Sequence, residues 1–273
     1  MEGSARRVSR GAGVRTLSLV SRRLAFVGAL LLLWEALTGG LGLPAILDPI
    51  IVARPSAALQ EIARYSASGL LVKDVTVTLQ EATIGLLLGI GGGVVFGLLL
   101  GYLRPLAETV EPVLVAFNSL PRIALAPVLI IAFGLGIASK IFLSLFTVFF
   151  VIFFNTYLGI RSVDPELVKA LRVMGGDRWD LARYVVLPSV FAWIFAALRT
   201  SVSFALSGAV VGEFVGSTSG LGYRMVISAG LLDTNRTYAI LLLLMAIAVV
   251  LVEIAKRVED RLLRWRPTAT LAS

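Results

Sequence analysis

Long apolar runs separated by short polar stretches are the dominant pattern of this 273-residue chain. Each run reaches or approaches the roughly 20 residues that a helix needs to cross the hydrocarbon core of a bilayer. Backbone amides cannot stay unpaired in hydrocarbon, and runs this long exclude the shorter alternating strands of a membrane barrel. The pattern therefore predicts an all-α, polytopic membrane protein with about six spans. The expected spans are 24–42, 76–102, 112–134, 140–160, 189–213 and 237–256.

The chain divides by composition into four parts. They are a basic N-terminal arm at 1–23, the first span with an external connector at 24–75, a core transmembrane domain at 76–256, and a tail at 257–273. In the connector, Ser56 is a suitable N-cap, so we expect a short amphipathic helix there. The basic arm is interpreted as a topology signal, with binding to lipid head groups as the less favoured alternative.

The net charge of +8 reflects topology rather than nucleic-acid binding. Basic residues gather before the first expected span, after the last one, and in the loop at 161–188. An even number of spans puts both termini on one side, and a cytoplasmic position for both satisfies the positive-inside rule. We therefore expect a multi-pass membrane protein with cytoplasmic termini and no nucleic-acid partner.

The chain contains no Cys and no His, which removes thiol chemistry and the commonest metal ligands. No carboxylate cluster stands in for them, and no phosphate-binding loop of the G-x-x-x-x-G-K-[ST] type occurs. We expect no catalytic residue, no metal and no cofactor on this chain.

Glycine recurs at every fourth position of the second expected span. The row consists of Gly85, Gly89, Gly93, Gly97 and Gly101. Small residues on one face let two helix backbones approach closely in lipid. The row therefore predicts a ridge for helix packing.

Pro121 and Pro127 are expected to interrupt the third span, because proline removes an amide donor and clashes with the preceding turn. Asn118, Ser119 and Arg122 lie beside this break. Polar groups at membrane depth are tolerated inside protein or along a wet cavity, which makes Asn118 and Arg122 candidates for a translocation pathway. A simple kink with Arg122 reaching an interface is the equal alternative.

The fifth expected span carries two ionisable residues, Arg199 and Glu213. Such groups are costly in lipid unless they are paired or hydrated, so both are candidates for the translocation pathway. Ser203 is a further candidate, although helix packing is the favoured role of the serines in this span. Glu81 stays ambiguous, because the second span can begin late enough to leave it near an interface.

The charged loop at 161–188 has the sequence of two short helices. Asp164 is a good N-cap, and Pro165 suits the first helical position. Gly175–Gly176 favours the left-handed cap that ends a helix. Asp177 can cap a second helix, and we expect Pro188 to start the next span.

The first of these two helices is amphipathic. Leu167, Val168, Leu171 and Met174 fall on one face. Such a face must be buried against the protein's own helix ends, the lipid surface or a groove of a partner. From the residues by themselves, a partner protein is about as well supported as the two other solutions taken together.

Lys169-Ala170-Leu171 is followed after three residues by Gly175 and, nine residues later, by Val185-Val186-Leu187-Pro188. This spacing resembles the Glu-Ala-Ala, Gly and Ile-x-Leu-Pro pattern of the permease subunits of binding-protein-dependent ABC importers, with Lys169 replacing the family's Glu. The stretches "SLPRIALAPVLIIAFGLGIASKI", "NTYLGIRSVDPEL" and "VVGEFVGSTSGLGY" look like the subgroup that imports nitrate, sulfonates, taurine and bicarbonate.

The resemblance implies a type I importer permease fold and a transport subunit that is not an enzyme. It implies two copies of a cytoplasmic ATPase that bind ATP and Mg²⁺, a second permease copy in a homodimer, an external solute-binding protein, and membrane lipid around the spans. It also implies a bacterial or archaeal plasma (inner) membrane, a small anionic cargo, and an external re-entrant or gating segment at 216–223, for which an ordinary loop is the alternative.

Under this resemblance the charged loop is the coupling helix that enters a groove of the ATPase. The implied coupling residues are Glu166, Leu167, Lys169, Ala170, Leu171, Met174, Gly175, Leu187 and Pro188. A secondary transporter driven by an ion gradient and a membrane scaffold or sensor without transport are the alternatives. The charged loop and the lack of an obvious inverted repeat argue against the first of them.

Overall fold

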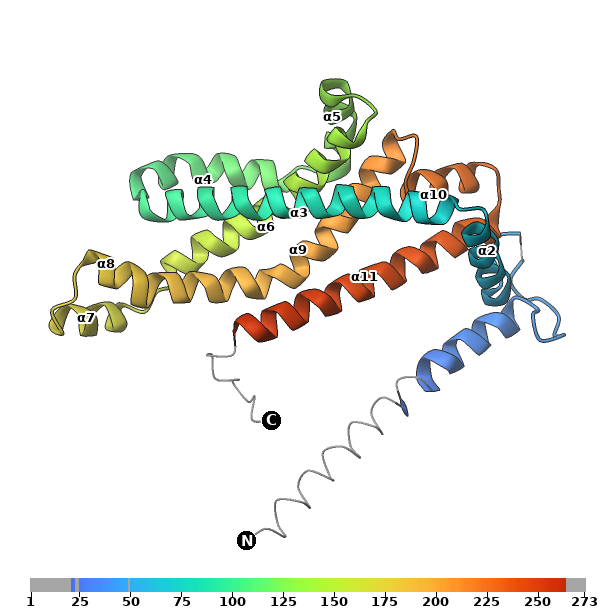
Figure 1. Cartoon of the computed structure of the whole chain (residues 1–273), viewed down its shortest axis with the longest axis horizontal. Helices are drawn as coiled ribbons and strands as arrows, with labels where there is room; N and C mark the ends of the chain where they lie inside the picture. Colours follow the sequence, from blue (N-terminus) through green and yellow to red (C-terminus); the bar gives the residue numbers. More distant parts are fainter. Residues whose placement is uncertain (1–20, 23–24, 49, 264–273) are drawn as a thin grey trace, which may run out of the picture. The chain divides into compact units, whose positions relative to one another are not determined.

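The computed structural model describes residues 21–22, 25–48 and 50–263, and every regular element among them is helical (Figure 1). The expected all-α fold is thereby confirmed. The basic arm at 1–23, apart from residues 21–22, and the tail beyond residue 263 lie outside the described residues. After the helix Ala25–Leu37, the elements are α2 Pro55–Ala67, α3 Leu70–Tyr102, α4 Arg104–Ser119, the 3₁₀ turn η1 Arg122–Ala124, α5 Leu125–Phe133, α6 Ile137–Arg161, α7 Pro165–Val173, α8 Arg178–Leu181, the π-helix η2 Ala182–Val186, α9 Leu187–Val215, α10 Leu221–Gly230 and α11 Thr234–Leu262.

The chain forms two compact units. One contains the described residues up to Ala67 together with Ser228–Ala239, and the other contains Ser68–Ile227 and the described residues from Ile240 onward. The helix α11 therefore contributes its first residues to one unit and the rest to the other. The charged loop and the pathway candidates all belong to the second unit.

In the first unit, polar contacts join the end of the helix Ala25–Leu37 to α2. Ser56 donates hydrogen bonds to Glu35 from its backbone N–H at 2.9 Å and from its hydroxyl at 2.6 Å. The expected helix is present, but Ser56 is not its N-cap. The helix begins one residue earlier at Pro55. The N–H and hydroxyl of Ser56 bond the carboxylate of Glu35, which lies earlier in the chain.

Four of the described helical stretches are long and apolar enough to cross a membrane: α3, α6, Arg178–Val215 and α11. They correspond to the expected spans 76–102, 140–160, 189–213 and 237–256. The expected span 112–134 is instead a pair of helices, Pro105–Ser119 and Arg122–Phe133, bent by 87°. If this pair is one span, the described residues contain five candidate spans. The part of the first expected span that the structure describes is a shorter apolar helix, Ala25–Leu37.

The bend in the third span lies at Pro121, as predicted. Leu120 adopts an extended conformation with φ −65° and ψ 135°, because the residue before a proline avoids the helical region. Pro127 causes no break. It lies in the first turn of α5, where the amide that proline lacks has no partner within the helix.

The packing of α3 against α6 in the second unit depends on the glycine row, which confirms the predicted ridge. Gly85, Gly89, Gly93 and Gly97 on α3 face Ser144, Val148, Ile152 and Thr156 on α6, so both rows advance by four residues. A Cβ atom placed on Gly93 would lie 2.8 Å from the Cβ of Ile152, which is closer than carbon atoms approach. The helix α9 packs against both of these helices and completes the apolar core.

Pro188 lies in the first turn of α9, as expected, but the second helix of the charged loop continues into this span without a break. The helix α8 passes through η2 into α9, so that Arg178–Val215 forms one helical stretch. Pro188 has no N–H to donate to the carbonyl four residues earlier. The N–H of Leu187 bonds the carbonyl of Ala182, five residues back, and the helix widens locally into a π-turn instead of ending.

Candidate functional site

The charged loop folds as two capped helices, in agreement with its sequence. At the start of α7, Oδ1 of Asp164 accepts a hydrogen bond from the N–H of Glu166 at 2.8 Å. At its end, Gly175 has a φ of 83°, and the N–H of Gly176 bonds the carbonyl of Leu171 at 3.0 Å. These are the bonds of a glycine C-cap, so the predicted joint between the two helices is present.

The second helix begins with a reciprocal pair of caps. Oδ1 of Asp177 accepts hydrogen bonds from the N–H groups of Trp179 and Asp180, both at 2.8 Å. In return, Oδ2 of Asp180 accepts the N–H of Asp177 at 3.1 Å. This capping box fixes where the short helix α8 begins through bonds within the loop itself.

Large apolar side chains on this loop are exposed. Their exposed fractions are 88% for Val173, 77% for Met174, 72% for Trp179, 62% for Tyr184 and 55% for Leu167. Of the apolar face predicted for α7, Leu167 and Met174 are exposed, whereas Val168 and Leu171 are half-buried. The apolar surface also extends past Gly175 to residues that the sequence pattern did not single out.

The remaining coupling candidates have different surroundings. Lys169 forms an exposed ion pair with Glu166 on the same helix, with Nζ and Oε1 2.9 Å apart. Ala170 is exposed, and Leu187 and Pro188 lie in the first turn of α9. The Lys that replaces the family's Glu therefore has its partner inside α7.

The residues beside the broken span do not form one cluster. The guanidinium of Arg122 lies 4.8 Å from the ring centre of Phe204 on α9, a cation–π contact that holds η1 against that helix. Asn118 is exposed at the end of α4. Ser203 is half-buried, and its hydroxyl donates to the carbonyl of Arg199 at 3.5 Å.

Arg199 is paired. Its Nη2 lies 2.9 Å from Oε2 of Glu259 on α11, and 44% of the Arg199 side chain is exposed. Because a carboxylate from another span offsets the charge, the presence of Arg199 within an apolar helix can be explained without a solute.

Glu213 belongs to a buried cluster and contacts the start of α10, a helix that lies at the opposite end of α3 from α7 and α8 (Figure 1). Its Oε1 accepts the hydroxyl proton of Thr78 at 2.7 Å, and its Oε2 accepts the N–H of Gly222 at 2.5 Å. Asp74 accepts the N–H of Gly220 at 3.0 Å, and Thr78 accepts that of Leu221 at 2.9 Å. The first amides of α10, which have no partner within that helix, are thus capped from α3 and α9.

Lys140 and Glu81 complete this cluster. The Nζ of Lys140 donates to the carbonyls of Leu135 at 2.5 Å and Gly136 at 3.0 Å, and its charge acts on both Glu81 and Glu213. Glu81 is buried inside the protein, and its Oε2 has no hydrogen-bond partner among the described residues. The segment 216–223 is therefore a loop followed by the start of α10, held by buried polar groups.

The chain matches a protein family over much of its length. The model of the family described as binding-protein-dependent transport system inner membrane component matches residues 93–264, which include the charged loop and α9. The chain belongs to this family. It is a membrane-spanning permease subunit of an ABC importer, and hydrolysis of ATP takes place in a separate ATPase subunit.

Three curated permeases are similar along most of their length. The riboflavin transport system permease protein of Chloroflexus aurantiacus is 35% identical over 86% of this chain and 87% of its own. The formylaminopyrimidine transport permease protein of Halalkalibacterium halodurans is 31% identical over 87% of this chain and 92% of its own. The putative aliphatic sulfonates transport permease protein of Bacillus subtilis is 29% identical, covering 86% and 83%.

A solved structure agrees with this family. A chain from inward-facing conformations of the MetNI methionine ABC transporter superposes with a TM-score of 0.59 at 25% identity, covering 71% of the permease and 95% of that chain. The permease is accordingly a multi-pass inner-membrane protein that works with an ATPase and a solute-binding protein. The secondary transporter and the scaffold are not favoured.

The sequence pattern did not single out Asp74, Thr78 or Lys140 as members of a buried cluster. One signal was available, because Asp74, Thr78 and Glu81 stand at i, i+4 and i+7 and continue into the glycine row. A polar stripe that merges with a packing ridge indicates burial against another helix. It does not indicate which segment the stripe contacts.

Proposed function

We propose that residues 164–188 of this permease, named the coupling segment here, dock in a groove of the ATPase. One observation carries the proposal: apolar side chains are exposed on a charged loop that is otherwise internally capped. Burying a side chain the size of Leu or Met contributes roughly 1.5–3 kcal/mol, which an exposed loop forgoes unless a partner covers it.

The connection to α9 supports a mechanical role for the coupling segment. Its second half is continuous with α9 through η2, so a displacement of α8 is carried along a helix rather than absorbed by a loop. The same helix carries Arg199, which pairs with α11, and Glu213, which caps α10. We infer that ATP-driven movement of the coupling segment reaches both contacts through α9.

The proposed assembly contains two permease copies and two ATPase copies, with ATP and Mg²⁺ in the ATPase. The coupling segment and both termini lie in the cytoplasm, an orientation supported by the distribution of basic residues. The external solute-binding protein delivers the solute to the opposite face. We further propose that Arg122, half-buried against Phe204 beside the broken span, faces the translocation pathway in part of the transport cycle.

The proposed cargo is a small organic solute. The similar proteins are named for riboflavin, a formylaminopyrimidine and aliphatic sulfonates. The similarity to the sulfonate permease of Bacillus subtilis supports an anionic cargo. The sequence identity is higher, however, to the permease named for riboflavin, at 35% against 29%. Uptake of radiolabelled solutes by proteoliposomes containing permease, ATPase and binding protein tests each class directly.

The docking proposal is tested by changing Leu167 and Met174 together to Glu. Both side chains are exposed, so the permease should still fold, whereas two carboxylates inside a partner's groove are costly without counter-ions. The double variant should lose the ATPase in a detergent pull-down and lose transport as well. Leu231→Glu is the matched control, because Leu231 is 75% exposed and lies outside the coupling segment. Full ATPase binding by the double variant would contradict docking.

A further inference from the structure

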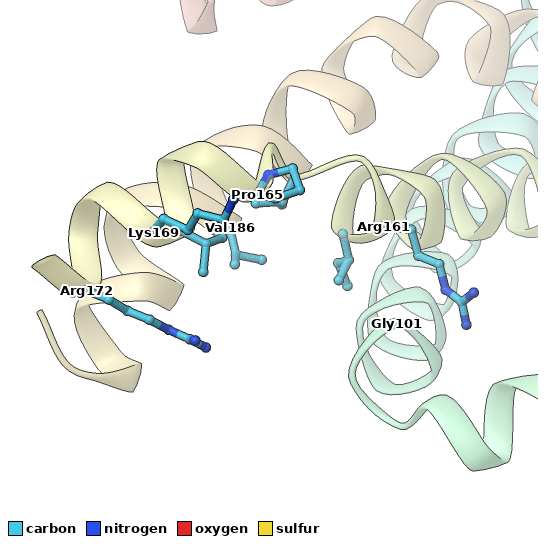
Figure 2. A pocket seen from close by; sticks show the side chains of 9 residues that line it. Gly101, Arg161, Pro165, Lys169, Arg172 and Val186 are labelled. Atoms are coloured by element: carbon cyan, nitrogen blue, oxygen red, sulfur yellow. The ribbon is translucent and has the colours of Figure 1, made fainter.

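A basic pocket lies beside the coupling segment, between the ends of α3 and α6 and one face of α7 (Figure 2). It has a volume of about 490 Å³. Gly101, Ile160 and Val168 form part of its wall, and Arg161, Lys169 and Arg172 supply three cationic groups. Figure 2 shows Arg172 extending from α7 toward the end of α3, whereas the side chain of Arg161 extends from the end of α6 away from α7.

The charge in this pocket is only partly offset. Lys169 pairs with Glu166 at 2.9 Å, and the guanidinium of Arg161 lies 4.9 Å from the ring centre of Tyr157. Neither Arg161 nor Arg172 forms an ion pair with any described residue of the chain. The pocket therefore has an excess of positive charge next to apolar walls, which suits an anion that carries an apolar part.

The pocket and the docking surface use different faces of α7. Pro165, Val168, Lys169 and Arg172 stand at i, i+3, i+4 and i+7 and form the face that lines the pocket. Leu167 and Met174 stand seven residues apart on another face and are exposed. A partner that covers Leu167 and Met174 thus leaves the basic face unused.

The height of the pocket in the membrane indicates the ligand. Gly101 is the next-to-last residue of α3 and Arg161 is the last of α6, so the pocket is at the ends of two membrane-spanning helices. Lipid head groups lie at this level, and basic pockets between spans bind anionic lipid head groups. We propose that Arg161, Lys169 and Arg172 bind the phosphate group of an anionic phospholipid, whose acyl chains remain in the bilayer.

Bound lipid would connect the coupling segment to the membrane-spanning helices. Lys169 and Arg172 belong to α7, whereas Arg161 belongs to α6, so a phosphate bound by all three would join the two elements once the Arg161 side chain turns from Tyr157 toward α7. This role rests on the membrane-spanning fold and does not require that Leu167 and Met174 dock on the ATPase.

The test measures the affinity of the detergent-purified permease for phosphatidylglycerol in mixed micelles, with phosphatidylcholine as the neutral lipid. Binding of phosphatidylglycerol should raise the Tm of the permease. Changing Arg161 and Arg172 together to Gln should weaken this binding by about 30-fold and abolish the rise in Tm, because two basic contacts are lost. Arg178→Gln is the matched control, since Arg178 is exposed on α8 and does not line the pocket.

Each alternative result overturns the proposal in a recognisable way. Unchanged phosphatidylglycerol affinity in the double variant excludes the pocket as the lipid site. An equal rise in Tm with inorganic phosphate alone assigns the site to a free anion instead of a lipid. Normal lipid binding combined with loss of the ATPase in a pull-down assigns the basic face to the partner protein. If the variant with Glu at positions 167 and 174 still binds the ATPase, the docking proposal is wrong, but the lipid-binding outcomes are unaffected.

Discussion

The Nε of Arg224 on α10 donates a hydrogen bond to Oδ2 of Asp74 on α3 at 2.6 Å. The other oxygen of Asp74 accepts the N–H of Gly220, so one buried carboxylate holds both the side chain and the start of α10. The segment that follows α9 is therefore fastened to α3 by an ion pair in addition to the caps from Thr78 and Glu213.

Removing this ion pair should destabilise the second unit. Asp74→Asn and Arg224→Gln should each lower the Tm of the permease in detergent, because each removes the counter-charge of the other residue, and Asp74 is buried while Arg224 is half-buried. A double-mutant cycle should yield a coupling free energy of roughly 0.5–3 kcal/mol. Lys73→Gln is the control, since Lys73 is exposed beside Asp74. Additive effects of the two changes would contradict a direct interaction.

A methyl group on the glycine ridge should separate α3 from α6. Gly93→Ala places a Cβ 2.8 Å from that of Ile152, and overpacking of this kind costs about 1–3 kcal/mol. Gly91→Ala is the matched control on the same helix, because nothing lies within 4 Å of its new Cβ. Thermal unfolding in detergent should show a lower Tm for Gly93→Ala alone. Equal Tm values for the two variants would mean that the close approach is absent.

The pairing of Arg199 with Glu259 makes two possible roles of Arg199 distinguishable. If the arginine is needed for pairing, Arg199→Glu should impair uptake, and the swapped variant with Glu259→Arg should recover much of it, because the ion pair is restored in reverse. A pathway role requires a positive charge at position 199 itself. Uptake that stays impaired in the swapped variant, with normal assembly and Tm, would establish that role.

Several elements of the coupling segment could be predicted from the sequence because their stabilising contacts are local. The caps formed by Asp164, Asp177 and Gly176 each join residues at most five positions apart. The residues of this short segment therefore determine where its helices start and end. The bend at Pro121 follows in the same way, from sterics between adjacent residues.

The sequence placed Pro188 in the first turn of α9 but did not predict that α8 continues into this helix, because that outcome depends on packing. Proline removes one donor, and two outcomes are open to the chain: the helix can end, or it can shift to bonds over five residues. Packing decides between them. Val186 and Val190 are buried in the core of the second unit, and this burial favours a helix that continues through the π-turn.

The sequence by itself determined the long helices, their small-residue and polar faces, and the family of the permease. Only the tertiary structure decided which faces meet: Gly93 with Ile152, Arg199 with Glu259, and Asp74 with Arg224, which is 150 positions away in the chain. Periodicity reports that one face of a helix avoids lipid, because a 3.6-residue repeat aligns those side chains. Their contacts depend on how all the helices pack together, and an apolar or polar stripe carries no record of its partner.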